Sequence, residues 1–281
     1  MDICIFGDIV NFIYCKAIGE IVLGESQSID TIISTTGNDA AIVTFVLAKL
    51  GKKALFVPLS CVSSKHLHKM ETAGISVIDP KIWDPGGKTV LVEDGSGRRT
   101  FLSACPPFFD KIRVPKGAEF LYIDFYEEHI DILCQFLNEV EKSECTCLYI
   151  NLSSSNIIEK AAFLSGYERK PDFIQFSCDE SDALQILETI SCYLKESVLI
   201  ATYGSSGSCM LSNGEKHFYR SDHPDGRDIM GAGAFFSAYY ISAFCETKHV
   251  VLAHSYACQE TSRLCQNSTN ILLQSLSEVG K

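Results

Sequence analysis

The sequence predicts an α/β protein with a mostly parallel central sheet flanked by helices. From residue 119 onward, short apolar runs alternate with segments of helical periodicity, which is the pattern of βαβ units with right-handed crossovers. Most of these runs are apolar on both faces, as expected of strands buried between two helical layers. Two stretches, near 20–34 and 89–102, mix β-branched and polar residues instead. We therefore expect a small second sheet that stands off the main one and is exposed on one face.

The amino-terminal part shows how each element is assigned. Ile3–Phe6 is apolar throughout and ends at Gly7, which predicts a buried strand followed by a turn. From Asn38 to Leu50 the apolar residues recur at helical spacing, and Gly51 stops the helix. The same reasoning predicts strands at 20–23, 28–34, 54–59, 75–78, 89–93, 99–102, 119–123, 147–151, 172–176 and 197–202, a hairpin at 208–220, and helices at 64–74, 127–141, 156–165, 180–194, 231–245 and 249–266.

Composition restricts the class of protein. The 281 residues are 46% hydrophobic, enough for one large core. The net charge of −11, with no run of Lys and Arg, argues against nucleic acid or an anionic membrane as a partner. The start of the chain has no basic segment before an apolar one, and no apolar run approaches 18 residues. We therefore expect a cytoplasmic protein without a membrane span.

The thirteen cysteines are scattered, odd in number and free of any C-x-x-C pair. Most of them fall inside apolar runs, as Cys4 and Cys61 do, which predicts reduced thiols packed as small hydrophobic side chains. A single reactive thiol stays open as an alternative, because spacing says nothing about a thiol pKa. The histidines show no H-x-x-H or H-E-x-x-H spacing, so the sequence gives no support for a catalytic metal other than Mg²⁺.

A stretch of small residues, Gly231-Ala232-Gly233, stands directly before the predicted helix at 231–245. Small residues at a helix start leave backbone N–H groups free and close together, and the helix dipole adds positive potential. The stretch therefore predicts an anion site. The alternative is a tightly packed helix start that binds nothing.

The seven residues from Asp228 to Ala234, Asp-Ile-Met-Gly-Ala-Gly-Ala, resemble the carboxyl-terminal signature of the ribokinase/PfkB family, Asp-Thr-x-Gly-Ala-Gly-Asp. The resemblance implies a three-layer, ribokinase-like fold that forms a single domain over 1–281, with a small β-sheet lid from segments near 15–36 and 88–103. It also implies transfer of the ATP γ-phosphoryl group to a sugar hydroxyl, in which the Gly-Ala-Gly amides hold the phosphate and the final Asp is the base. Here that position is Ala234, whose methyl group cannot accept a proton.

The resemblance also implies a nucleotide site that uses ATP and Mg²⁺. The turn with Thr202, Gly204 and Gly207 corresponds to a family turn that lies against the nucleotide; alone, it could equally be an ordinary strand-to-strand turn. Asp179 and Asp182 resemble the family's Asn-x-x-Glu element, which orients a magnesium-bound water. The same two residues could simply begin a capped helix.

The expected sugar site departs from the family at several positions. The family's sugar-binding Asp falls at Phe12, with Asn11 one residue before it. The family's Gly-Gly-x-x-x-Asn becomes Gly37-Asn38, three further residues, and then Ile42, which has no polar group for a ligand. Where relatives often carry Asp, this chain has Asn151. Arg98 and Arg99, on the expected lid, could contact an anionic or hydroxylated ligand or form a solvated rim.

Two functions follow from the resemblance. The first is a carbohydrate kinase whose activity is weak or absent because the base position is Ala234. The second is a pseudokinase that binds a nucleotide or small metabolite in a regulatory or assembly role. Met230 before the Gly-Ala-Gly stretch also resembles fructoselysine-type kinases, which implies a sugar or sugar-amine ligand. Exposed lid strands would favour a homodimer that covers their edges.

Overall fold

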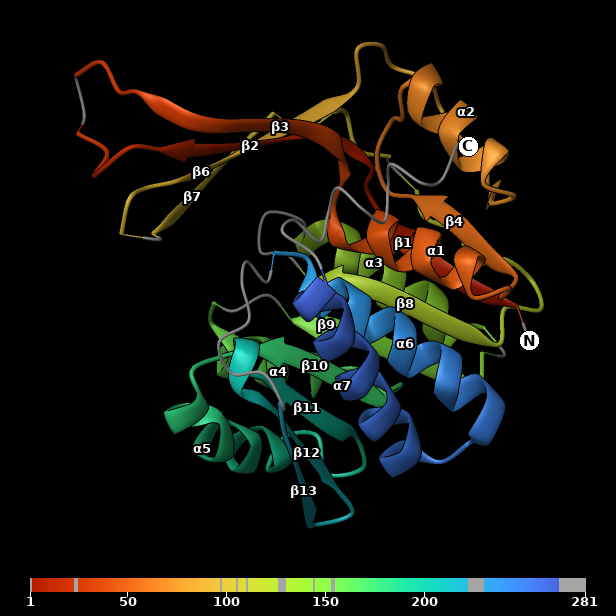
Figure 1. Ribbon diagram of the computed structural model, residues 1–281. Helices are drawn as coiled ribbons and strands as arrows, with labels where there is room; N and C mark the ends of the chain where they lie inside the picture. The colour runs from red at the N-terminus through yellow and green to blue at the C-terminus, as the bar shows by residue number, and fades with distance from the viewer. Residues whose placement is uncertain are drawn as a thin grey trace.

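The computed structural model describes residues 2–22, 25–96, 98–104, 106–109, 111–125, 130–143, 145–152, 155–221 and 230–267. A nine-stranded sheet lies at its centre (Figure 1). Its strands follow in this order across the sheet: β13 (Glu215–Arg220), β12 (Gly207–Ser212), β11 (Val198–Thr202), β10 (Phe173–Ser177), β9 (Cys147–Leu152), β8 (Phe120–Phe125), β1 (Ile3–Gly7), β4 (Ala54–Pro58) and β5 (Ser76–Val77). The strands from β11 to β5 pair in parallel, and β12 and β13 add an antiparallel edge.

Helices cover both faces of this sheet (Figure 1). One layer consists of α1 (Asp39–Lys49), α6 (Ala232–Thr247) and α7 (Val250–Asn267), and the other of α3 (Ile130–Glu141), α4 (Ile157–Leu164) and α5 (Glu180–Ser191). The strands are apolar on both faces, so each face needs a covering layer. In β1, Ile3 and Ile5 belong to the core beneath the first layer, whereas Cys4 and Phe6 belong to the core beneath the second. A further helix, α2 (Ser64–Thr72), contributes Met70 to the first core.

The strand order reverses at β1. The chain passes from β1 outward to β4 and β5, and then returns to β8 on the other side of β1 before continuing to β11. In open α/β sheets, the crevice beyond the carboxyl ends of the strands at such a reversal is the usual place for a ligand. The loops after β1 and β8 are therefore the first places to look for a site.

A second sheet of four strands stands off the body (Figure 1), as the sequence predicts. Its strands, in order, are β3 (Ile29–Gly37), β2 (Val10–Ala17), β6 (Gly87–Glu93) and β7 (Arg99–Ala104), and we call it the lid sheet. The predicted strand at 20–23 is wrong: residues 20–22 form no strand, and residue 23 lies outside the described residues. The strand is β2 instead, which bonds to both β3 and β6 and buries Phe12 and Tyr14.

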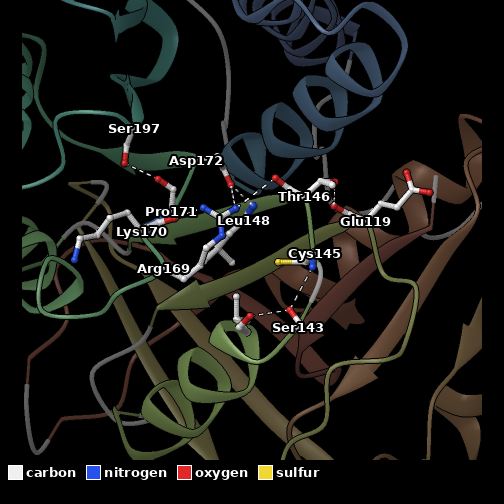
Figure 2. A network of polar contacts seen from close by, with 11 residues as sticks. Glu119, Ser143, Cys145, Thr146, Leu148, Arg169, Lys170, Pro171, Asp172 and Ser197 are labelled. Carbon is white, nitrogen blue, oxygen red and sulfur yellow. Dashed lines mark hydrogen bonds and ion pairs between the residues drawn. The ribbon is translucent and has the colours of Figure 1, made fainter.

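Polar contacts hold together the amino ends of the central strands (Figure 2). The Asp172 carboxylate accepts a hydrogen bond from the Leu148 backbone N–H at 2.7 Å and pairs with the Arg169 guanidinium. The Thr146 hydroxyl donates to the Glu119 carbonyl oxygen at 2.6 Å. These contacts lie at the opposite end of the sheet from the carboxyl ends, so they serve the fold rather than a site. None of the helices in the described part of the chain is long and apolar enough to cross a membrane.

Candidate functional site

A cavity of about 190 Å³ lies beyond the carboxyl ends of β10 and β11, under the start of α6. Five residues that the sequence singled out line its wall, namely Thr202, Gly204, Gly207, Ala232 and Gly233. The fold thus brings the Gly-rich turn and the Gly-Ala-Gly stretch to one place, although more than 20 residues separate them in the chain. Asp228, predicted to bind the cofactor, lies outside the described residues.

The Gly-rich turn needs its last glycine. Gly204–Ser206 forms one turn of 3-10 helix, and Gly207 follows with a φ of 132°, a conformation that disfavours other residues. A Cβ atom at Gly207 would lie 2.1 Å from the Tyr219 carbonyl oxygen, so β12 can pass this close to β13 only without a side chain. The Thr202 hydroxyl bonds the Ser177 hydroxyl at 2.9 Å, which ties the turn to the end of β10.

The Gly-Ala-Gly stretch is held by a buried amide. Gly231, with a φ of 80°, precedes the first turn of α6. Gln175 donates from Nε2 to the Gly233 carbonyl oxygen at 3.1 Å, and its Oε1 accepts from the hydroxyls of Tyr149 and Ser237. Gly233 and Ala234 lie in the first turn of α6, where backbone N–H groups have no acceptor within the helix and point toward its amino end. This arrangement supports an anion site at the helix start.

The expected sugar side is filled by apolar side chains. Phe12, Ile42 and Ala234 have exposed fractions of 8%, 2% and 1%, and all three belong to the same core cluster. Phe12 packs directly on Gly37, since a Cβ atom there would lie 3.0 Å from the Phe12 Cβ. The positions at which the family would place sugar ligands and the base thus pack against the protein itself.

The remaining residues predicted for the sugar have partners within the protein. Asn38 keeps a glycine-like φ of 111°, and its side-chain oxygen caps α1 by accepting from the Asp39 N–H at 3.1 Å. Asn11 donates to the Pro85 carbonyl oxygen at 3.3 Å. Arg99 pairs with Glu93 on the neighbouring strand of the lid sheet at 2.9 Å. A ligand would have to compete with these contacts.

Asp124 is a residue that the sequence reasoning missed. It lies near the end of β8, at the reversal of strand order, and accepts hydrogen bonds from the Tyr122 hydroxyl at 2.7 Å and from Asn151 Nδ2 at 2.9 Å. Burial, and after it the negative charge of Asp39, raise the pKa of Asp124 well above its ordinary value. A carboxylate within an otherwise apolar strand is the sequence signal that could have revealed it, because burial of such a group is costly.

The predicted magnesium residues lie apart from the cavity wall. Asp179 precedes the first turn of α5, and Asp182 accepts from the Ser181 hydroxyl at 2.9 Å; both are exposed. Carboxylates suit Mg²⁺ chemically, but neither lines the cavity. Within the described ranges, no group of three or more His, Cys, Asp or Glu side chains could hold a metal ion.

Three cysteines line the cavity, and nothing in the sequence signalled that they would lie there. Cys178, Cys258 and Cys265 are part of its wall, and the twelve cysteines of the described segments form no disulfide. Burial raises the pKa of Cys178 to about 11 and that of Cys258 to about 12, so these two thiols stay protonated near neutral pH. This finding agrees with the prediction of reduced thiols and opposes a reactive thiol at either position.

No protein-family model matches the chain, and the search of curated proteins finds no match. Solved structures, in contrast, match over nearly its whole length. Ribokinase from Cryptococcus neoformans var. grubii serotype A, in complex with ADP, gives a TM-score of 0.78 at 14% identity, covering 98% of this chain and 95% of that chain. Burkholderia thailandensis nucleoside kinase, in complex with inosine, gives 0.75 at 13% identity, with coverage of 99% and 94%.

Methanocaldococcus jannaschii nucleoside kinase, described as an archaeal member of the ribokinase family, matches with a TM-score of 0.74 at 13% identity and covers 99% of this chain and 98% of that chain. The chain therefore has a ribokinase-like fold, a large, mostly parallel sheet between helices with a small four-stranded sheet beside it. The predicted fold class is confirmed.

Proposed function

We propose that this chain is a nucleotide-binding protein built on a sugar-kinase fold, and that sugar phosphorylation by it is weak or absent. One contrast carries the proposal: a cavity is open beside the Gly-Ala-Gly stretch, whereas Phe12, Ile42 and Ala234 fill the sugar side. The chain would act as a pseudokinase in a regulatory or assembly role. The alternative is a slow carbohydrate kinase that acts on a sugar or sugar-amine.

Three observations support a nucleotide in the cavity. The first turn of α6 leaves backbone N–H groups without an acceptor in the helix, and a phosphate is favoured at such a helix start. Thr261 belongs to the cavity wall, and its buried hydroxyl has no hydrogen-bond partner among the described residues, so hydrogen-bonding capacity is left unused beside the cavity. One of the matching ribokinase structures was determined in complex with ADP.

ATP or ADP is the proposed nucleotide, with Mg²⁺ as its counter-ion. Asp179 and Asp182 offer suitable oxygen donors, but they stand outside the cavity wall and do not fit a direct contact with a metal in the cavity. No step of the proposed function is therefore assigned to them. Nucleotide binding should depend mainly on the Gly-rich turn and the Gly-Ala-Gly stretch.

Two measurements on the full chain test the proposal. Calorimetric titration with ATP and ADP, with and without Mg²⁺, measures nucleotide affinity. A phosphate-release screen over common sugars and sugar-amines, with an active ribokinase as control, measures turnover. Binding without sugar-dependent turnover is the expected result. Turnover at the rate of the control would contradict the proposal, and so would the absence of any nucleotide binding.

Restoring the base tests the same idea at one residue. If the base were all that is missing, Ala234→Asp would raise sugar-dependent ATP turnover by roughly 10²–10⁴-fold. We expect no rescue, because Phe12 and Ile42 still occupy the positions that would align the sugar. The new carboxylate also enters a buried site, so the variant should unfold at a lower temperature. Recovery of kinase activity by this single change would indicate an enzyme disabled at one position.

The proposal extends to a homodimer through the lid sheet of a single-domain chain, with lid segments near 15–36 and 88–103. The edge strands β3 and β7 expose large apolar side chains, with exposed fractions of 64% for Ile32, 60% for Phe101 and 59% for Leu102. Exposed strand edges that carry apolar side chains favour pairing with another chain. A second copy would cover them.

A further inference from the structure

A second hollow lies between the helix α3 and residues 111–113, the chain segment that leads to β8. It measures about 380 Å³, and small-molecule sites occupy about 300–1,000 Å³. We call it the α3 hollow. None of the described residues lines both this hollow and the cavity under α6, and α3 belongs to the helix layer on the other face of the central sheet from α6 (Figure 1). A ligand in the α3 hollow would therefore leave the cavity under α6 free.

The segment before β8 places two cations at the α3 hollow. Ile112 is buried and belongs to the core beneath α3, so it anchors the segment to the body. Lys111 and Arg113, on either side of it, are exposed and line the hollow. The anchor lowers the entropy cost of binding, because a ligand has to order the two side chains and not the backbone that carries them.

The helix α3 supplies the opposite wall. Gln135, Asn138, Glu139 and Lys142 are spaced three and four residues apart, so they follow one face of the helix and its end. The Lys142 ammonium donates to the Glu139 carboxylate at 2.7 Å, so this acid already has a partner. The side-chain amides of Gln135 and Asn138 add uncharged hydrogen-bond donors. Of the described residues that line the hollow, three are cations and one is an acid.

Lys111 and Arg113 lack acidic partners. Neither forms an ion pair or a hydrogen bond with any described residue. The chain has 35 acidic and 24 basic residues, so cations readily find carboxylates, as Lys53 does with Asp2. Two unpaired cations that face one hollow are therefore unusual in a protein of net charge −11. A concave surface that gathers charge of one sign raises the local concentration of ions of the other sign.

We propose that the α3 hollow binds a small metabolite with two or more negatively charged oxygen atoms, carried by a phosphate group or by several carboxylates. The Arg113 guanidinium can donate two parallel hydrogen bonds to either group. Lys111 and Lys142 add positive charge, and the excess of two cations on the wall matches a dianion. This site goes beyond the proposed function and does not depend on it.

Calorimetry on the full chain tests the site, with pyrophosphate and citrate as probes and acetate as a reference of single charge. The titrations use wild type and Gly233→Val, in which a side chain covers the proposed anion site at α6. Gly233→Val should bind one pyrophosphate or citrate per chain at least about tenfold more tightly than acetate. The probe that binds more tightly distinguishes a phosphorylated ligand from a polycarboxylate.

The cations are tested by substitution in the Gly233→Val background. Arg113→Gln should weaken binding of the tighter probe by about tenfold, and Lys111→Gln together with Arg113→Gln should abolish it. The matched control is Lys116→Gln, which removes a charge from an exposed position nearby in the chain but outside the wall, and should leave the affinity unchanged. Thermal unfolding checks the fold of each variant, which these exposed substitutions should preserve.

Glu139→Gln gives a readout that a damaged fold would not produce. It removes the acid from the wall and releases Lys142, so affinity for the tighter probe should rise by about threefold. Absence of binding by both probes in Gly233→Val, equal affinity for acetate, or equal losses in Arg113→Gln and Lys116→Gln would overturn this inference alone. Wild type that binds no ADP but binds a probe through Arg113 would contradict the proposed function and support the α3 hollow.

Discussion

His66 makes the stability of this fold depend on pH in the acid range. It is fully buried on α2, and neither ring nitrogen has a hydrogen-bond partner in the described part of the chain. Burial, and after it the positive charges of Lys65 and Lys69, lower the pKa of His66 to about 4. In the unfolded chain the same ring titrates near its ordinary 6.5. Below that pH the unfolded state therefore binds a proton that the folded state excludes.

We predict that His66→Leu stabilises the protein and that the gain grows in acid. Stability linked to His66 is fully present above pH 6.5 and is lost as the pH falls toward 4, by up to about 3 kcal/mol. Leucine removes that loss and the unpartnered nitrogens together. Urea unfolding at pH 7 and at pH 5 measures the effect, with exposed His68→Leu on the same helix as control. An equal gain at the two pH values would show that His66 is not the titrating group.

At the scale of elements, the proposed anion site requires that the start of α6 expose its backbone N–H groups, with no side chain covering them. A Cβ atom at Gly233 would lie 3.6 Å from Gln175 Nε2, an ordinary contact, so the position has room for a methyl group in the fold. Gly233 also lines the cavity, where a larger side chain would keep an anion from the helix amides.

We therefore expect Gly233→Val to fold and to bind ADP at least tenfold more weakly, since it blocks the approach of phosphate to the backbone. Gly233→Ala is the matched control and should retain more affinity, with similar stability. Calorimetry measures binding, and thermal unfolding checks the fold. Full ADP affinity in the valine variant would remove the Gly-Ala-Gly stretch from the proposed site.

The polar contacts at the amino ends of β9 and β10 should contribute to stability and not to nucleotide binding. Asp172→Ala leaves the Leu148 N–H without its acceptor and Arg169 without its ion-pair partner, so we expect a loss of about 2 kcal/mol. Nucleotide affinity should not change, because the cavity lies at the opposite ends of the strands. Denaturant unfolding and ADP titration measure the two quantities. Glu139→Ala, which breaks an exposed pair with Lys142, is a control that should change neither.

At the scale of the whole molecule, the proposed homodimer places the lid sheet at the interface between two copies. Phe101→Ser with Leu102→Ser removes the apolar surface of the edge strand β7, and we expect the double variant to shift from dimer to monomer. Light scattering coupled to gel filtration measures the mass over a range of concentrations. Exposed Phe218 on β13, at the edge of the central sheet, provides the control, because Phe218→Ser should leave the mass unchanged. A monomeric wild type would contradict the proposed dimer.

The sequence by itself determined the fold class, most element positions and the candidate loops. Local periodicity suffices for these, because a strand such as Ile3–Gly7 or a helix such as Asp39–Lys49 is written in consecutive residues. The sequence also showed that a base is missing at Ala234, since a methyl group cannot accept a proton in any fold. The strand β2 was not predicted. Ile13 and Cys15 are apolar on the face opposite Phe12 and Tyr14, so the segment lacks the alternation of apolar and polar residues that marks a half-buried strand.

Only the tertiary structure decided which residues meet. The contact of Gln175 with the Gly233 carbonyl joins positions 58 residues apart, and that of Ser208 with His254 joins positions 46 apart. No local pattern records such pairs, because strand order and helix packing bring them together. The same holds for burial: that Phe12, Ile42 and Ala234 share one core follows from how the lid sheet, α1 and α6 pack, and it could not be read from their spacing.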